Sequence, residues 1–207
     1  MLGETIKYEQ GPIRPPSEAA SLLIRLTRNC PWNRCLFCPV YKGEQFSRRS
    51  MDEVLGDLKE IFKAVEQVKE ISLANGWDGE VNRQAAALIQ SENPHLFQIA
   101  YWLYQGGKTV FLQDGDSLLL PVSQLVQILN FLKEQFPTVS RVTTYARSRT
   151  ILRRSVDELK QLKMAGLNRI HVGLESGNDA VLTFMQKGVT AAQHIDAVKR
   201  VKAAEFS

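Results

Sequence analysis

Three cysteines, Cys30, Cys35 and Cys38, lie within nine residues and are the only cysteines of the 207-residue chain. An odd number of thiols in one short segment is not a disulfide framework, and clustered free cysteines are typical of a reducing compartment. Thiolates at such spacing bind metals, and three of them leave one position of a four-coordinate site open. The segment therefore predicts a metal site with a free position for a small molecule.

Three kinds of metal site use such a segment. Structural zinc needs a fourth ligand, and the only histidines, His95, His171 and His194, are distant in sequence, so a zinc-binding module stays an alternative. A two-iron ferredoxin shares the opening spacing of four and then two residues but needs a remote fourth cysteine, which the chain lacks. The third possibility is a four-iron cluster held by three thiolates.

The elements that must position this segment alternate between strand and helix. We expect strands at 22–27, 109–113, 141–145 and 168–174. Helices are predicted after the capping boxes Ser50–Glu53, Ser155–Glu158 and Thr190–Gln193, from Pro121 to before Pro137, and from Asp179 to Lys187 with Gly188 as C-cap. This order predicts an α/β fold, a partial parallel (βα) barrel with four βα units.

Two segments fall outside the repeating units. Residues 1–19 contain Pro12, Pro15 and Pro16 and are expected to form an irregular leader before a domain at 20–207. Residues 72–106 are expected to be a helical insertion after the first unit, with helices near 80–90 and 95–105. Four units leave an edge on the fourth strand, which suggests a truncated product or a complementing chain that supplies the missing strands.

Several motifs in this order resemble the radical S-adenosylmethionine (radical SAM) superfamily. Phe37 directly precedes the last cysteine, the turn Gln113–Ser117 follows the second strand, and Gly173-Leu-Glu-Ser-Gly177 closes the fourth. The likeness spans about residues 20–205. It departs from the usual pattern in having four rather than three residues between the first two cysteines, and four rather than six βα units.

The resemblance implies a [4Fe-4S] cluster on Cys30, Cys35 and Cys38, with S-adenosylmethionine (SAM) on its open iron. It places Gln113 and Asp114 near the SAM amino group, Glu175 at the ribose hydroxyls and Phe37 near the adenine. Gly173 would leave room for the ligand, and Ser176 belongs to the same motif. Arg147 is the best placed of four arginines (Arg147, Arg149, Arg153 and Arg154) to grip the SAM carboxylate or an anionic substrate.

Each of these residues also has an ordinary structural role open to it. Glu175 can pair with a strand arginine such as Arg25, Phe37 can pack within the loop, and Gln113–Ser117 can simply be the turn that enters a helix. Period-two alternation puts His171, Gly173 and Glu175 inside the barrel, and Ile170, Val172 and Leu174 towards the helices. Arg28 and Arg34 are placed to favour thiolates at the cysteines.

Net charge and hydropathy narrow the functions and locations expected for the protein. The net charge is +4 with no Lys/Arg block, which is weak support for nucleic-acid binding. No apolar run is long enough to span a bilayer and no signal peptide opens the chain, so we expect a cytoplasmic protein. The expected function is generation of a 5′-deoxyadenosyl radical that abstracts hydrogen from an unknown substrate, with a reductant such as flavodoxin or ferredoxin. The alternatives are an inactive or partner-dependent fragment and the zinc module.

Overall fold

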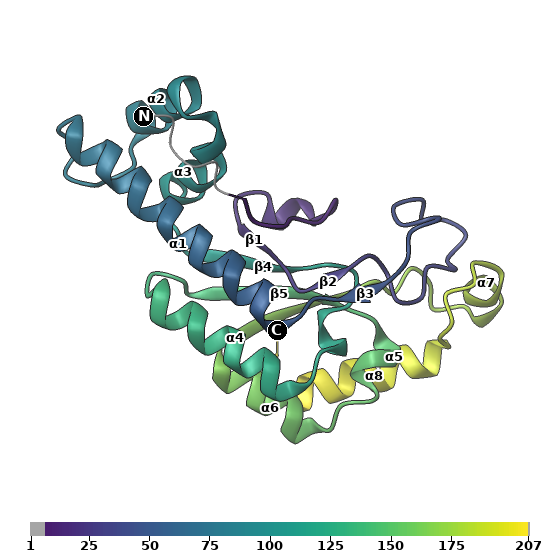
Figure 1. Ribbon diagram of the computed structural model, residues 1–207. Coiled ribbons are helices and arrows are strands. Elements are labelled where there is room, and N and C mark those ends of the chain that lie inside the picture. The colour runs from purple at the N-terminus through teal and green to yellow at the C-terminus, as the bar shows by residue number, and fades with distance from the viewer. Residues whose placement is uncertain (1–6, 207) are drawn as a thin grey trace.

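A four-stranded parallel sheet forms the centre of the computed structural model, which describes residues 7–206 (Figure 1). Its strands, in the order β1-β4-β5-β6, are β1 (Leu22–Arg25), β4 (Thr109–Gln113), β5 (Arg141–Ala146) and β6 (Leu167–Val172). The fold class predicted from the sequence is confirmed. The fourth strand ends at Val172 instead of the predicted residue 174.

Helices cover one face of the sheet, because each carries an apolar stripe against the strands. They are α1 (Met51–Ala74), α4 (Val122–Gln135), α6 (Val156–Ala165) and α8 (Ala191–Ala203). The capping boxes at Ser50, Ser155 and Thr190 all form as predicted. Alternation in β6 is also as predicted, since Ile170 is buried in the helix-side core and Val172 packs against it.

The insertion forms two helices packed beyond the C-terminal half of α1. They are α2 (Arg83–Glu92) and α3 (Phe97–Tyr104), joined by the 3₁₀ turn η2 (Pro94–Leu96). Both predicted helices are confirmed, although α1 runs to Ala74 and so overlaps the predicted start of the insertion. Within residues 7–206, no helix has the length and apolar character needed to cross a membrane.

Residues 7–19, called the leader below, lie across the sheet face opposite α4 and α6 (Figure 1). Gln113 donates from Nε2 to the carbonyls of Gly11 and Ile13, at 3.3 and 2.6 Å, and its Oε1 accepts from the Gly11 amide. Near the turn η1 (Pro16–Glu18), the fully buried Glu18 pairs with Arg141 of β5. The leader is irregular as predicted, but the sequence did not predict that it packs on the sheet. Predicted leader residues 1–6 lie outside the described part of the chain.

Short elements surround the carboxyl ends of the strands. They are β2 (Thr27–Arg28) paired with β3 (Ser47–Arg48), the turn η3 (Ser117–Leu119), α5 (Ser148–Ile151) and α7 (Asp179–Phe184). Helix α7 is shorter than the predicted 179–187, so Gly188 is not its C-cap. Gly188 has φ +74° and lies under the ring of Trp32, where a Cβ atom would overlap the indole. The positive φ and this close approach to Trp32 are the reasons why the position requires glycine.

Candidate functional site

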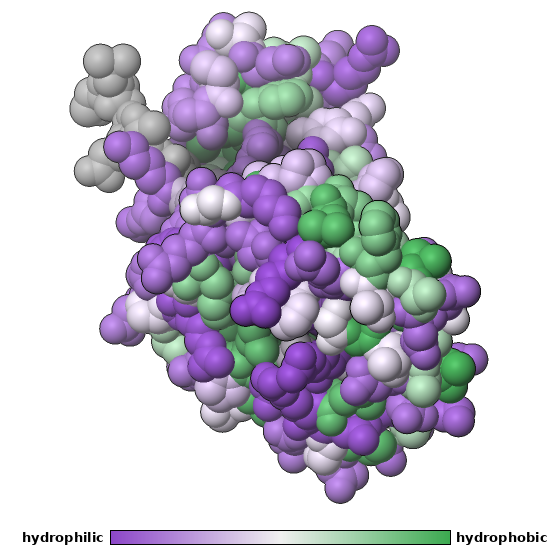
Figure 2. All heavy atoms as spheres, turned by 90° about the vertical axis from the view of Figure 1, so that its right-hand side faces the viewer, coloured by the Kyte–Doolittle hydropathy of each residue, from purple (hydrophilic) through white to green (hydrophobic). Residues whose placement is uncertain are grey.

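The residues predicted to do chemistry meet at one end of the sheet. In parallel strands all carboxyl ends share one edge, where ligands of α/β folds bind. Asp114 follows β4, Arg147 follows β5, Glu175 follows β6, and the cysteine loop, residues 29–46, lies between β2 and β3. These loops and α7 occupy the right-hand side of Figure 1. Figure 2 looks onto this end, where hydrophobic residues gather in patches among hydrophilic ones.

The three cysteines are free, half-buried thiols, and Cys30 and Cys38 lie close enough to Cys35 to affect its pKa. Burial raises the pKa of Cys35, the positive charges of Lys187 and Arg147 oppose this, and the other two thiols add to it. The loop has little regular structure, with one turn closed by the Cys38 amide on the Cys35 carbonyl at 3.3 Å. The positive charge at Cys35 therefore comes from Lys187 and Arg147, and not from Arg28 and Arg34 as the sequence predicts.

The tip of the loop is attached to the segment between α7 and α8. The Leu36 amide donates to the Met185 carbonyl at 3.0 Å, and Trp32 Nε1 donates to the Gln186 carbonyl at 2.7 Å. Leu36 and Phe37 are 56% and 47% exposed, so these bonds lie close to solvent. We call this set of contacts, from Trp32, Leu36 and Phe37 to residues 185–188, the tip contact.

Arg147 reaches the cysteine loop from the end of β5. Its guanidinium stacks on the Trp32 ring at 4.7 Å and its Nη2 donates to the Lys187 carbonyl at 2.9 Å. Burial lowers its pKa, while the nearby Cys30 thiol and Asp116 carboxyl act in the opposite direction. Arg34 stacks on the same indole at 5.1 Å. Arg154 instead donates to the Leu118 and Leu120 carbonyls, a structural role away from the cysteines.

Glu175 lies beside the loop and pairs with Lys187, not with Arg25. The Lys187 Nζ is 3.0 Å from Glu175 Oε1 and 5.4 Å from the centre of the Phe37 ring. A Cβ at Gly173 would lie 2.6 Å from Glu175 Oε1, so the glycine makes room for this ion pair. Ser176 Oγ accepts a bond from the Asn178 amide at 3.1 Å. Phe37, Lys187 and Glu175 thus form a row along the open side of the loop.

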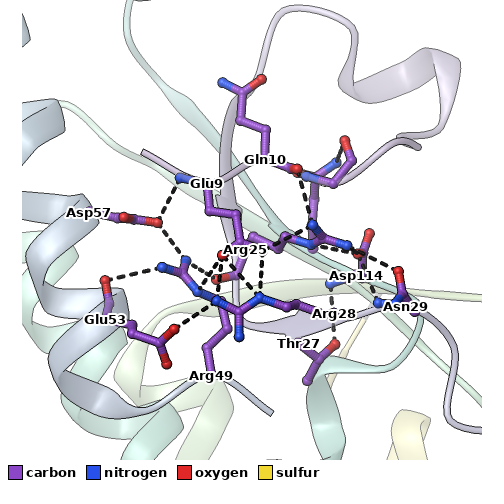
Figure 3. A network of polar contacts seen from close by, with 12 residues as sticks. Glu9, Gln10, Arg25, Thr27, Arg28, Asn29, Arg49, Glu53, Asp57 and Asp114 are labelled. Carbon is purple, nitrogen blue, oxygen red and sulfur yellow. Dashed lines mark hydrogen bonds and ion pairs between the residues drawn. The ribbon is translucent and has the colours of Figure 1, made fainter. Parts of the chain in front are cut away.

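Gln113 and Asp114 are fully buried and bound to protein groups. Gln113 holds the leader, as described above. Asp114 accepts from Arg25, from the Asn29 amide at 3.2 Å and from the Tyr41 hydroxyl at 2.8 Å (Figure 3 shows the first two). The predicted role of these two residues beside the SAM amino group stays a prediction.

His171 lies on the sheet face that carries the leader, as alternation predicts. Its Nε2 is 3.8 Å from the Glu18 carboxylate and its ring centre is 6.0 Å from that of Tyr145. It is therefore part of the contact between the leader and the sheet.

Several residues of this region were not found by sequence reasoning: Tyr41, Lys187, Trp32 as a stacking platform, and Glu9 of the leader. Trp32 lies between the first two cysteines and Lys187 ends a predicted helix, so the sequence places both near the site, but it does not show which groups they contact. Glu9 carried no signal, because its arginine partners are separated from it by 16 to 40 residues of chain.

The donors of the cysteine loop fit an iron–sulfur cluster by their chemistry, because all three are thiols. A [4Fe-4S] cluster is held by thiolates that each bind a separate iron and that converge on one cubane, and positive charge nearby favours the thiolate form. Among residues 7–206, no three His, Cys, Asp or Glu side chains are grouped to hold a metal ion. This finding includes the three cysteines, so it favours neither the cluster nor the zinc alternative.

Comparison with known proteins identifies the family. The sequence model of the radical SAM superfamily matches residues 95–207, more than half of the chain. The chain belongs to the radical SAM superfamily, whose enzymes use a [4Fe-4S] cluster and SAM. The match begins after the cysteine loop and does not include the three cysteines, whose role as cluster ligands stays a prediction.

The chain is also similar to a known protein in sequence and to solved structures in fold. The chain is 25% identical over 202 residues to tRNA-2-methylthio-N(6)-dimethylallyladenosine synthase of Hahella chejuensis, covering 96% of this chain and 36% of that protein. The cobalamin-dependent SAM radical enzyme OxsB with aqua-cobalamin bound superposes with a TM-score of 0.59 at 21% identity, covering 90% of this chain and 23% of OxsB. The structure with SAM also bound gives the same TM-score at 20% identity. These structural matches show the fold, and the chain spans about a third or less of each relative.

Proposed function

We propose that this chain is the cluster- and SAM-binding part of a radical SAM enzyme. The observation that carries the proposal is the position of three thiols in one loop, at the carboxyl ends of parallel strands and beside Lys187 and Arg147. When bound, the reduced [4Fe-4S] cluster and SAM supply a 5′-deoxyadenosyl radical that abstracts hydrogen from a substrate. A one-electron reductant such as flavodoxin or ferredoxin would supply the electron.

The residues around the loop divide the remaining work. Cys30, Cys35 and Cys38 are the proposed cluster ligands, and Lys187 and Arg147 stabilise their thiolates. Arg147 is also the proposed partner of the SAM carboxylate, because its guanidinium is fixed between Trp32 and the Lys187 carbonyl.

The SAM nucleoside is assigned to the row of Phe37, Lys187 and Glu175. Glu175 is the proposed acceptor for the ribose hydroxyls, and its carboxylate is one-third exposed and therefore accessible. Phe37 offers an exposed aromatic face for the adenine. Gly173 and Ser176 shape the turn that carries Glu175, and Gln113 and Asp114 bound the site on the side of β4.

Anaerobic reconstitution with iron and sulfide tests the proposal. We expect a brown protein with about four irons per chain that forms 5′-deoxyadenosine from SAM and a reductant. Cys30→Ala, Cys35→Ala and Cys38→Ala should each lose the bound iron, whereas Arg154→Lys, away from the loop, should keep it. A colourless protein that holds one tight zinc ion under these conditions would refute the assignment.

A second candidate is a fragment that acts only with a complementing polypeptide. It is favoured by the free edge of β6, which among the described strands pairs with β5 alone. Beside the end of β6 lies a groove along α8 whose apolar residues Leu174, Ile195 and Val198 are 45%, 56% and 37% exposed. This candidate predicts that reconstituted protein binds iron but forms 5′-deoxyadenosine only after a polypeptide that adds strands to β6 is supplied. Turnover by the monomeric chain, established by size-exclusion chromatography, would exclude it.

A further inference from the structure

Asp114 is bound to both ends of the cysteine loop at once. Its Oδ2 accepts from the amide of Asn29, the residue before Cys30, at 3.2 Å. Its Oδ1 accepts from the hydroxyl of Tyr41, three residues after Cys38, at 2.8 Å. One buried carboxylate therefore joins the entry and the exit of the segment that carries all three thiols. We call Arg25, Asn29, Tyr41 and Asp114 the buried clamp.

Arg25 holds this carboxylate in place from the first strand. Its Nε and Nη2 lie 2.8 and 2.6 Å from Asp114 Oδ2, and its Nη2 also donates to Asn29 Oδ1 at 3.3 Å. A charged pair with several hydrogen bonds in a buried place has few alternative arrangements. Asn29 has φ +67°, a conformation that its bonds to Asp114, Arg25 and the Gln45 carbonyl maintain. The turn into the cysteines is thus fixed from three sides.

The leader completes the clamp from the other side of Arg25. Glu9 Oε1 is 3.0 Å from Arg25 Nη1, and Glu9 also pairs with Arg28 and Arg49 (Figure 3). Burial opposes its ionisation, but the bond from Arg28 and the three arginine charges outweigh this and lower the pKa of Glu9. Gly11 packs so closely on Asp114 that a Cβ would overlap the carboxylate. The leader therefore packs directly against the Asp114 carboxylate, which binds both ends of the cysteine loop.

Tyr41 and Gly115 also hold the two ends of the cysteine loop close to Asp114. Burial and the negative charge of Asp114 raise the pKa of Tyr41, so its hydroxyl keeps its proton and always donates. Gly115, next to Asp114, lies against Cys30, where an added Cβ would be 3.4 Å from the cysteine Cα. A loop of turns loses much conformational entropy when it is ordered. Contacts made before a ligand arrives remove that cost from ligand binding.

We propose that Asp114 is a positioning residue that, with Arg25, Tyr41 and Glu9, sets the geometry of the cysteine loop before any cluster binds. This differs from the SAM-contacting role that the sequence predicted for Asp114. The inference rests on the proposed cluster-binding role of the loop, but the order of the loop in the metal-free protein is measured independently of that role.

Hydrogen exchange of the metal-free full chain tests the clamp. Tyr41→Phe removes one hydroxyl and keeps the ring, and it should speed exchange of amides in 29–45 by about tenfold or more, the worth of a buried bond to a charged group. Amides of β4 and β5 should keep their rates. Tyr104→Phe is the matched control, since Tyr104 on α3 is 42% exposed. Unchanged exchange across 29–45 in Tyr41→Phe would overturn the proposal.

Iron loading and SAM affinity then separate positioning from ligand contact. With Tyr41→Phe and Asp114→Asn, a positioning role predicts lower iron content after reconstitution but an unchanged SAM dissociation constant for the clusters that do form. If Asp114→Asn weakens SAM binding at full iron content and leaves the loop protected, Asp114 is a SAM contact and the proposal is wrong. If wild type takes up no cluster while Tyr41→Phe still loosens the loop, the clamp stands and the proposed function fails.

Discussion

The cysteine loop is attached at two places that differ in burial. The buried clamp joins its two ends through Asp114, which is fully buried and charge-paired with Arg25. The tip contact joins its middle to residues 185–188 through two hydrogen bonds and stacking on Trp32, beside the partly exposed pair of Lys187 and Glu175, whose side chains are 12% and 34% exposed. The first attachment fixes where the loop starts and stops, and the second sets how its open side faces the region proposed for SAM.

The difference indicates which part of the site is built in advance and which part adjusts. Buried ion pairs cost several kcal/mol to break, whereas exposed pairs contribute at most about 1 kcal/mol. The ends of the loop should therefore hold their geometry without ligand. The row of Phe37, Lys187 and Glu175 can rearrange at little cost, as a segment that admits a ligand must.

The largest contrast is expected between two carboxylate-to-amide variants. Asp114→Asn removes the buried charge partner of Arg25, which keeps Glu9 as its ion-pair partner among the described residues, and should lower the free energy of unfolding by about 3–5 kcal/mol. Glu175→Gln should change it by less than about 1 kcal/mol, because that pair is partly solvated. Chemical denaturation of the metal-free protein measures both. Equal losses would mean that the two attachments do not differ in strength.

Asp116 sharpens the comparison, because it lies two residues from Asp114 and is equally buried but has no ion-pair partner among the described residues. Burial raises its pKa to about 7, against a smaller opposing effect of the Thr150 hydroxyl. The folded state therefore keeps a proton that the unfolded chain releases near pH 4, and this group's contribution to stability falls as pH rises from about 4 to 7.

Asp116→Asn should remove that loss. Relative to wild type, the variant should gain on the order of 2–4 kcal/mol in free energy of unfolding between pH 4 and pH 8. The quantity to measure is the difference between the two stability curves, because other titrating groups then cancel. A difference that stays constant with pH would show that the Asp116 carboxyl ionises normally in the fold.

A pair of glycine variants tests the leader side of the clamp. Gly11→Ala places a methyl group onto the Asp114 carboxylate and should cost about 1–3 kcal/mol, as overpacking does. Gly56→Ala in α1 adds a methyl group in open space and should instead stabilise the protein by up to about 1 kcal/mol. Thermal unfolding of both variants gives the signs. A neutral Gly11→Ala would mean that the leader does not press on Asp114.

Local rules predicted the elements, and the cysteine spacing predicted the kind of site. Strand alternation, three capping boxes and the insertion helices were readable because they depend on neighbours within a few residues. The partners of Asp114 and Glu175 were not, since Arg25 and Tyr41 reach Asp114 across 89 and 73 residues of sequence. The leader was predicted only as irregular, because prolines report on local conformation and not on the surface against which a segment packs.

The smallest effect, and the one that compares the attachments within a single molecule, is their response to salt. The Asn29 amide reports on the buried clamp through its bond to Asp114, and the Leu36 amide reports on the tip contact through its bond to Met185. Raising ionic strength from about 0.1 to 1 M shortens the screening length from about 10 to 3 Å and weakens exposed pairs most. Exchange at Leu36 should rise about two- to threefold, as expected for the weakening of a partly exposed pair, while Asn29 stays constant. In Glu175→Gln the salt response of Leu36 should disappear, because the charge that the salt screens is gone. If exchange at Asn29 responded to salt as strongly as exchange at Leu36, the buried clamp would be accessible to ions. The buried clamp and the tip contact would then not differ in burial as proposed.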